Sequence, residues 1–218
     1  HSKAELDAMG VTNPEIILSA DPTVILPAAE NATVDGLLES AGLDPQGRYI
    51  GFTLRPWPGF EAKAPIFAKA ADYAYEKYGL IPVFLPIEPR LDTGAARLVA
   101  ASMTAPHYLL PGAASSRMKV VVSMRLHALV FSAGQAVPLV GVVYDPKISS
   151  FLSYIGQDLY TDLNALTPEG LTAHIDAAVA RIGDDAFLSE GVDRLRAVER
   201  RNQDTAGALL GLKGERAE

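Results

Sequence analysis

The sequence contains no cysteine. Disulfide bonds, thiolate metal sites and a thiol nucleophile are therefore excluded, and the composition fits a reducing compartment. No apolar run approaches the roughly 20 residues that a membrane-spanning helix needs. The formal net charge is −7, and lysine and arginine form no dense block. Because a protein that binds nucleic acid normally has a basic face, we do not expect a nucleic-acid partner.

Several catalytic motifs are also missing. The sequence has no glycine-rich dinucleotide motif after a strand, no P-loop, no paired-histidine zinc motif and no serine nucleophile elbow. We therefore expect neither a metal nor a cofactor. The N-terminus has no initiator methionine and no signal peptide, and it leads directly into a helical pattern. We interpret this as an internal start, with an upstream part removed or not included.

The remaining composition is that of a globular protein, with 49% hydrophobic and 21% charged residues. From residue 48 onward, apolar runs of strand length alternate with helical patterns. This alternation predicts a mostly parallel sheet, and we expect a Rossmann-like α/β domain with C-terminal helices over residues 48–218. Residues 1–47 carry several Pro, Asn and Gly residues, and we interpret them as the end of an upstream domain plus an interdomain connection. Expected strands cover 15–19, 49–54, 80–86, 107–110, 119–123 and 138–143, and expected helices cover 2–9, 34–41, 61–78, 92–103, 125–135, 146–154, 167–182 and a last one from Asp184 or Asp185 to about 210.

One connection is unusually short. Only residues 111–118 separate the expected strands 107–110 and 119–123. A crossover between neighbouring parallel strands needs about a dozen residues, usually including a helix. Either the two strands are not neighbours, or residues are absent here; we favour absent residues.

Cationic side chains follow the expected strands at their carboxyl ends, where an open parallel sheet binds its ligands. Arg55, Arg125 and Lys147 each come shortly after a strand, and His127 lies at a strand–helix junction. The backbone N–H groups of Leu126 and His127 begin that helix and have no partner within it. Three cations and an imidazole at one sheet edge of an acidic protein predict an anion-binding site.

These cationic residues and His127 also have structural interpretations. Arg125 could form a salt bridge, Arg55 could pair with a carboxylate, and His127 could be a structural histidine. Lys147 lies in the first turn of a helix, where a cation opposes the helix dipole, which indicates a ligand or a carboxylate partner.

The polar and aromatic candidates at the same edge are Trp57, Ser123, Tyr144 and Asp145, which we expect to bind an acceptor or to support the site. Trp57 and Tyr144 could stack on a sugar or simply cover the edge of the sheet. Asp145 could contact a ligand or cap the helix that follows it.

The block SMRLHALVFSAGQAVPLVGVVYDPK, residues 123–147, resembles the signature of the polysaccharide pyruvyl transferases. The segments LRPW (54–57) and VFLPIEPRLD (83–92) agree with this family, as do SKAELDAMGV and ILSADP near the N-terminus. The resemblance covers nearly the whole chain. The short connection at 110–119 departs from the family pattern, in which a helix lies there, and the N-terminal half expected of the family is missing.

The resemblance implies two Rossmann-like halves in a GT-B-type arrangement, of which this chain is the C-terminal, donor-binding half. It implies an enzyme that moves the pyruvate unit of phosphoenolpyruvate onto two hydroxyls of one sugar as a cyclic ketal and releases phosphate. The implied acceptor is a sugar of a bacterial cell-wall polymer that anchors surface-layer proteins, or the lipid-linked precursor of that polymer. We therefore expect a cytoplasmic enzyme, with peripheral association at the inner face of the membrane. The resemblance implies no metal.

The resemblance also assigns roles. Arg125 and His127 are similar to the donor-binding and acid residues of the family, and Arg55 resembles a second donor-binding arginine. Guanidinium groups suit this donor because they bind phosphate and carboxylate in bidentate forks. A histidine side chain in water has a pKa of about 6.5, which suits it to protonate the methylene carbon of the donor.

Two other functions stay open at this point. One is a GT-B-type glycosyltransferase that uses a nucleotide sugar, for which Asp145 is the candidate carboxylate for the ribose hydroxyls. The other is a non-enzymatic module that binds a phosphorylated metabolite.

Overall fold

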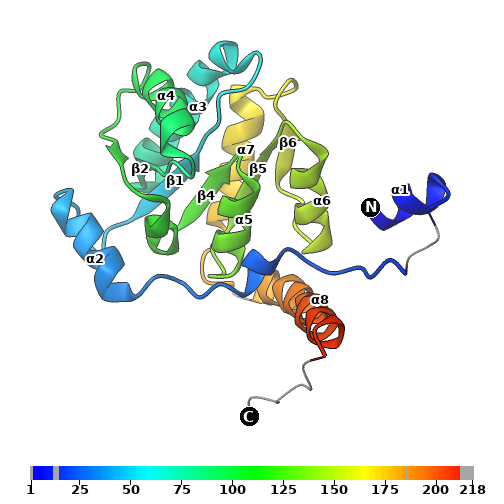
Figure 1. Cartoon of the computed structure of the whole chain (residues 1–218). Helices are drawn as coiled ribbons and strands as arrows, with labels where there is room; N and C mark the ends of the chain where they lie inside the picture. Colours follow the sequence, from blue (N-terminus) through cyan, green and yellow to red (C-terminus); the bar gives the residue numbers. More distant parts are fainter. Residues whose placement is uncertain (1, 12–14, 185, 212–218) are drawn as a thin grey trace.

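The computed structural model describes residues 2–11, 15–184 and 186–211, and a parallel sheet of six strands lies at its centre (Figure 1). The strand order is β3-β2-β1-β4-β5-β6, and each neighbouring pair is parallel. The expected Rossmann-like α/β class is confirmed. The strands are β1 (Tyr49–Thr53), β2 (Ile81–Phe84), β3 (Tyr108–Leu109), β4 (Val120–Ser123), β5 (Leu139–Val143) and β6 (Tyr160–Asp162).

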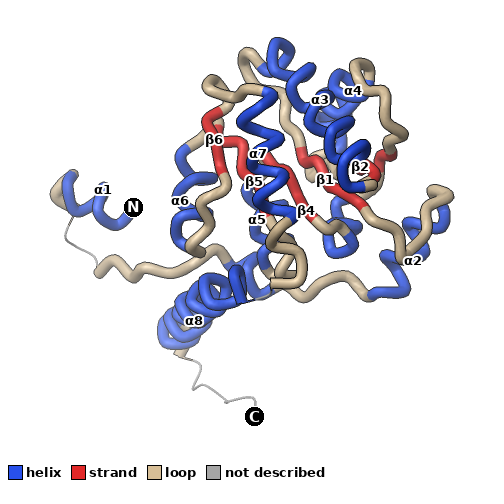
Figure 2. The backbone as a smooth tube through the Cα atoms, turned by 180° about the vertical axis from the view of Figure 1, so that it is seen from behind, coloured by secondary structure: helices blue, strands red, loops and turns tan. Residues whose placement is uncertain are grey.

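Helices cover both faces of the sheet (Figure 2). On one face lie α3, α4 and α7, and on the other lie α5, α6 and the 3-10 helix η2, with α2 and α8 at its margin. The helices are α1 (Ser2–Ala8), η1 (Pro22–Ile25), α2 (Asn31–Ser40), α3 (Phe60–Tyr78), α4 (Pro89–Ala100), η2 (Gly112–Arg117), α5 (Leu126–Ala133), α6 (Pro146–Tyr154), α7 (Pro168–Val179) and α8 (Ala186–Leu209).

The central strand β4 contains three consecutive valines, and the layers of the fold explain why. Val120 and Val122 join the core under α3 and α7, while Val121 joins the core under α5 and α6. Side chains alternate between the two faces of a strand, and helices cover both faces here, so all three valines must be apolar. The three valines are 0% exposed.

Several expectations from the sequence differ from the structure. The expected strand at 15–19 does not form, and this segment has no strand pairing. The short strand β6 and both 3-10 helices were missed, because segments of three to six residues carry too little periodicity to recognise. The last helix begins at Ala186; of its two expected caps, Asp185 lies outside the described residues.

The short connection between β3 and β4 has a simple explanation. The two strands are not neighbours, since β2 and β1 lie between them. Three strand spacings of about 4.8 Å amount to about 14 Å, and an eight-residue segment can reach more than about 25 Å. The 3-10 helix η2 crosses this distance, so no additional residues are needed to join these strands.

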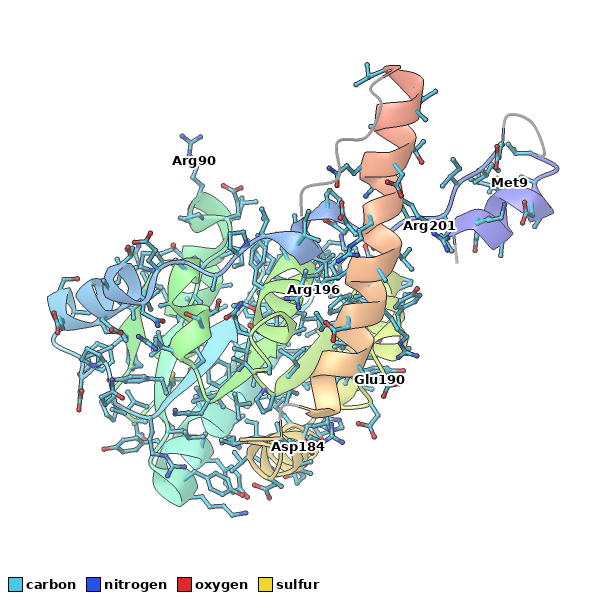
Figure 3. The ribbon with its side chains drawn as sticks, turned by 90° about the horizontal axis from the view of Figure 1, so that it is seen from below. Met9, Arg90, Asp184, Glu190, Arg196 and Arg201 are labelled. Carbon is cyan, nitrogen blue, oxygen red and sulfur yellow. The ribbon has the colours of Figure 1, made fainter. Side chains whose placement is uncertain are left out.

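Residues 15–29, here called the connector, cross the domain from α1 to α2 (Figure 1). Helix α8 holds the connector by polar contacts to backbone oxygens. Asn202 Nδ2 donates to the oxygen of Ala20 at 3.0 Å, and Ser19 Oγ donates to the oxygen of Val198 at 3.0 Å. Figure 3 shows Arg201 of α8 beside the connector, where its Nη1 donates to the oxygen of Leu18 at 3.3 Å. The connector is therefore fixed to the body of the fold, whereas α1 lies apart from the sheet and its covering helices (Figure 1).

Within the described part of the chain, no helix has the length and apolar character needed to cross a membrane.

The seat of α8 depends on a glycine. A Cβ at Gly191 would lie 2.4 Å from the oxygen and 2.5 Å from the Cα of Ile155, at the end of α6. These are backbone atoms that cannot turn aside, so Gly191→Ala should displace α8 and destabilise the fold by about 1–3 kcal/mol. Gly36→Ala is the matched control, because that helical glycine has nothing within 4 Å. It should raise stability by about 0.5–1 kcal/mol. Urea unfolding of both variants checks this, and a loss that is equal in the two would contradict it.

Candidate functional site

The candidate site lies at the carboxyl ends of β1 and β4, the two strands in the middle of the sheet. Thr53 and Ser123 are register partners, and their hydroxyl groups form a hydrogen bond. Arg55 and Arg125 each follow two residues later, so both begin at the same level of this edge. Ser123 is fully buried, and its Oγ accepts from the N–H of Arg125 at 2.9 Å. Ser123 therefore shapes the turn from β4 into α5.

Arg125 is held by a carboxylate that the sequence analysis did not single out. Its Nε lies 3.1 Å from both oxygens of Asp92, and its Nη2 also contacts this carboxylate. The side chain of Asp92 is 1% exposed and that of Arg125 is 13% exposed, so this is a largely buried ion pair. Asp92 also accepts from the N–H groups of Ile87 and Glu88 at 3.0 and 2.8 Å, at the start of α4. The salt-bridge interpretation of Arg125 is thus confirmed.

Arg55 lies among aromatic rings. Its Nη1 donates to Tyr144 Oη at 2.9 Å, and its guanidinium lies 5.6 Å from the ring centre of Trp57 and 5.4 Å from that of Tyr144. The two rings are themselves 4.4 Å apart. The ammonium of Lys147 lies 5.9 Å from the Tyr144 ring. We call Arg55, Trp57, Tyr144 and Lys147 the aromatic–cation cluster.

Asp145 caps α6, which was one of its two expected roles. Its Oδ1 accepts from the N–H of Lys147 at 3.0 Å, and Pro146 occupies the first helical position. Its Oδ2 lies 3.6 Å from Lys147 Nζ, and this is the carboxylate partner expected for a cation in the first turn.

The two arginines turn in opposite directions from neighbouring strands. Arg55 reaches from β1 to a tyrosine that follows β5, whereas Arg125 reaches from β4 to an aspartate in the helix that follows β2. Each side chain therefore passes over the neighbouring strand end. The sequence places both guanidinium groups at one edge, and in the structure they have separate partners.

His127 lies in the first turn of α5 and is open to solvent, with 50% of its side chain exposed. Its ring stacks on Phe131 one turn later, with 6.2 Å between ring centres. Its Nε2 lies 3.6 Å from Oδ2 of Asp21, a residue of the connector. An imidazole in this position can exchange protons with a bound molecule. Asp21 was not among the candidate site residues, because nothing in the local sequence indicates the distant histidine.

The pKa of the Asp21 carboxyl is lowered. Partial burial acts to raise this pKa, but hydrogen bonds from the N–H and the hydroxyl of Thr23, together with the nearby His127, outweigh the effect of burial. Asp21 is therefore ionised at neutral pH and presents a negative charge to the imidazole.

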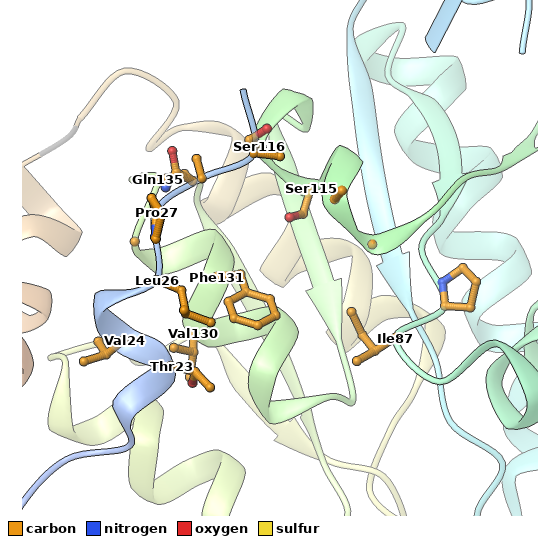
Figure 4. Close-up of a pocket in the computed structure, with 16 residues that line it drawn as sticks. Thr23, Val24, Leu26, Pro27, Ile87, Ser115, Ser116, Val130, Phe131 and Gln135 are labelled. Carbon is orange, nitrogen blue, oxygen red and sulfur yellow. The ribbon is translucent and has the colours of Figure 1, made fainter. Parts of the chain in front are cut away.

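A cavity of about 330 Å³ lies between the connector and α5 (Figure 4). The connector forms one wall and α5 another, and η2 with the loop after β2 closes the opposite side. Phe131 lines this cavity and stacks on His127, so it connects the two. None of the lining residues is charged, and the cavity therefore suits an uncharged group better than a phosphate. In the described ranges, no three His, Cys, Asp or Glu side chains are grouped so that they could hold a metal ion.

The Arg125–Asp92 pair should contribute to stability as well as to the site. Asp92→Ala leaves a largely buried guanidinium without its counter-charge and removes the acceptor for two N–H groups, so we expect a loss of about 3–5 kcal/mol. Asp35→Ala is the control, because its partner Arg117 is 25% exposed and Asp35 is 30% exposed. That substitution should cost less than about 1 kcal/mol. Urea unfolding measures both, and similar losses in the two variants would argue against a special role for Asp92.

Comparisons with known proteins identify a family and a shared fold. A family model for polysaccharide pyruvyl transferase matches residues 1–146. No curated protein sequence matches the chain. Among solved structures, UDP-GlcNAc 2-epimerase from Neisseria meningitidis bound to UDP-GlcNAc is similar, with a TM-score of 0.66 and 10% identity over 94% of this chain and 58% of that one.

Two transferases have the same fold. The glycosyl transferase family 9 protein from Veillonella parvula gives a TM-score of 0.52 and 19% identity, over 81% of this chain and 58% of that one. The E. coli ADP-heptose lipopolysaccharide heptosyltransferase II gives 0.54 and 15%, over 80% and 57%. The chain thus spans a little over half the length of these proteins, and its fold resembles one half of a GT-B-type enzyme. Because the family model covers most of the chain, including the turn that carries Arg125 and His127, the chain belongs to the polysaccharide pyruvyl transferase family.

Proposed function

We propose that the chain is the donor-binding half of a pyruvyl transferase that joins the pyruvate unit of phosphoenolpyruvate to two hydroxyls of one sugar as a cyclic ketal and releases phosphate. One observation carries this proposal. Two arginines begin at the same level of the β1–β4 edge, and the solvent-open imidazole of His127 lies in the first turn of the helix that follows.

The charges of this edge suit a small donor with two anionic groups. Arg125 uses its Nε and Nη2 for Asp92, so its Nη1 side remains for an oxyanion of the ligand. Arg55 offers a second guanidinium beside two aromatic rings. The N–H groups of Leu126 and His127 at the start of α5 add further donors for phosphate or carboxylate. Together these groups can bind both ends of phosphoenolpyruvate.

The reaction needs one proton at carbon. In the proposed sequence, a sugar hydroxyl adds to the central carbon of the donor while the imidazolium of His127 gives a proton to the methylene carbon, which becomes a methyl group. The second hydroxyl of the sugar then displaces phosphate from the same central carbon. One hydroxyl proton replaces the proton that His127 gave, and the other leaves on phosphate. Arginine stabilises the charge that develops on the departing phosphate.

The acceptor we propose is a sugar of a cell-wall polymer or its lipid-linked precursor, which would bring the protein to the inner face of the membrane. Trp57 is 37% exposed and lies against Tyr144, so this pair offers an aromatic surface on which a sugar ring can stack. Lys147, beside the same tyrosine, offers a hydrogen-bond donor for the sugar. We propose no metal and no cofactor.

A nucleotide-sugar glycosyltransferase is less well supported. Asp145 was the candidate for binding the ribose hydroxyls, and its carboxylate caps α6 and pairs with Lys147. This leaves the rival function without its expected carboxylate.

His127→Ala tests the proposal. The side chain is half exposed, so the variant should fold, and loss of a general acid should lower turnover by about two to four orders of magnitude. The measurement is phosphate release from phosphoenolpyruvate by the full-length protein, with sugars that carry neighbouring hydroxyls as acceptors.

His107→Ala is the matched control for that experiment. His107 is also exposed, but it precedes β3 at the opposite end of the strands and contacts the oxygen of Ala105. Its variant should release phosphate at the wild-type rate. A near-wild-type rate in His127→Ala would remove His127 from the mechanism.

A further inference from the structure

We propose that Asp21 is a positioning residue for His127: its carboxylate holds the imidazole by Nε2 and so presents Nδ1 to the reacting molecule. This inference rests on the proposed function, in which His127 gives the proton. The contact is 3.6 Å between Asp21 Oδ2 and His127 Nε2. That is the distance of an ion pair rather than of a hydrogen bond, and catalytic contacts of this kind commonly shorten when the substrate binds.

The two oxygens of Asp21 have separate tasks. Oδ1 caps the 3-10 helix η1, where it accepts from the N–H of Thr23 at 2.9 Å and from its hydroxyl at 2.7 Å. Pro22 occupies the first position of η1 and restricts the backbone at this point. With Oδ1 committed to the turn, the carboxylate cannot rotate freely, and Oδ2 is directed at the imidazole.

The connector that carries Asp21 is itself anchored on both sides. Before Asp21, Asn202 of α8 donates to the oxygen of Ala20. After it, Val24 is 5% exposed and packs in the core that also contains Leu129 and Val130 of α5. The charge that faces His127 therefore comes from the connector, not from the sheet edge. Any movement of the connector would change the distance between this charge and the imidazole.

The other charges near α5 have different partners. Arg125, at the N-terminal end of α5, is paired with Asp92. Arg196 of α8 lies at the opposite end of α5, where its Nη2 is 3.9 Å from the position of a Cβ on Gly134. Helix η1 itself carries no charged residue, and Asp21 is its N-cap. Among the ion pairs of the described residues, the charge that faces His127 is that of Asp21.

Asp21→Asn removes this charge and keeps an oxygen that can cap η1. An exposed ion pair is worth at most about 1 kcal/mol, which corresponds to about fivefold in an equilibrium constant or a rate. We therefore expect the ratio of the Nε2–H form to the Nδ1–H form of the neutral His127 ring to fall up to about fivefold in the variant. We also expect turnover to fall up to about fivefold.

The experiment measures the two ring nitrogen shifts of His127 by NMR, in histidine-labelled full-length protein without substrate and at alkaline pH, and then measures the rate of phosphate release. Asp44→Asn is the matched control, because Asp44 also accepts from a backbone N–H two residues later, that of Gln46 at 2.9 Å, and forms no ion pair with a histidine in the described chain. It should change neither readout. Asp21→Glu, which restores the charge, should recover part of both losses.

The outcomes separate the two proposals. An unchanged tautomer ratio in Asp21→Asn overturns the role of Asp21, whatever the enzyme does. A changed ratio, with no phosphate release by the wild-type protein, shows that the contact exists but overturns the proposed function, and with it the positioning role. A changed ratio together with lowered turnover supports both.

Discussion

The parallel pairing of β1 with β4 is the constraint on which the rest of this structure depends. The chain order of the sheet reverses at this pair, since β2 and β3 lie on one side and β5 and β6 on the other. The connections that leave the two strands therefore diverge, and open parallel sheets generally bind their ligands at such a reversal, beyond the carboxyl ends of the strands. The register of Thr53 with Ser123 then fixes the level at which Arg55 and Arg125 leave the sheet.

Each cation at this edge of the sheet already has a partner within the protein, which a ligand would have to join. Asp92 holds Arg125, Tyr144 accepts from Arg55, and Asp145 pairs with Lys147. The protein as a whole is acidic, so these partners keep the cations oriented without making the surface basic. An anionic donor gains most where a guanidinium is already fixed, because less side-chain entropy is lost on binding. This arrangement fits the proposed dianionic donor at the two arginines, whereas the uncharged cavity beside Phe131 suits an uncharged group.

Much of the fold could be predicted from the sequence. Apolar runs of strand length, such as the valines of β4, indicated the strands, and the alternation of strands and helices indicated the parallel sheet. Because parallel strands present their carboxyl ends at one edge, the common position of Arg55 and Arg125 also followed.

What could not be predicted is the choice of partner for each charged side chain. Asp92 lies in the first turn of α4, where its interaction with the helix dipole is reason enough for a carboxylate. Asp21 caps η1, and this local role is reason enough for its presence there. Neither position carries a local sign of its distant partner, and the short connection could be understood only once the strand order was known.

The central claim is that Arg55 and Arg125 bind the same small dianion, and a double-mutant cycle on donor binding tests it most directly. Phosphoenolpyruvate affinity would be measured by titration calorimetry for the full-length protein, for Arg55→Ala, for Arg125→Ala and for the double variant. If both arginines hold one donor, each single variant loses affinity, and the loss in the double variant differs from the sum by about 0.5–3 kcal/mol. Unchanged affinity in either single variant would contradict the claim.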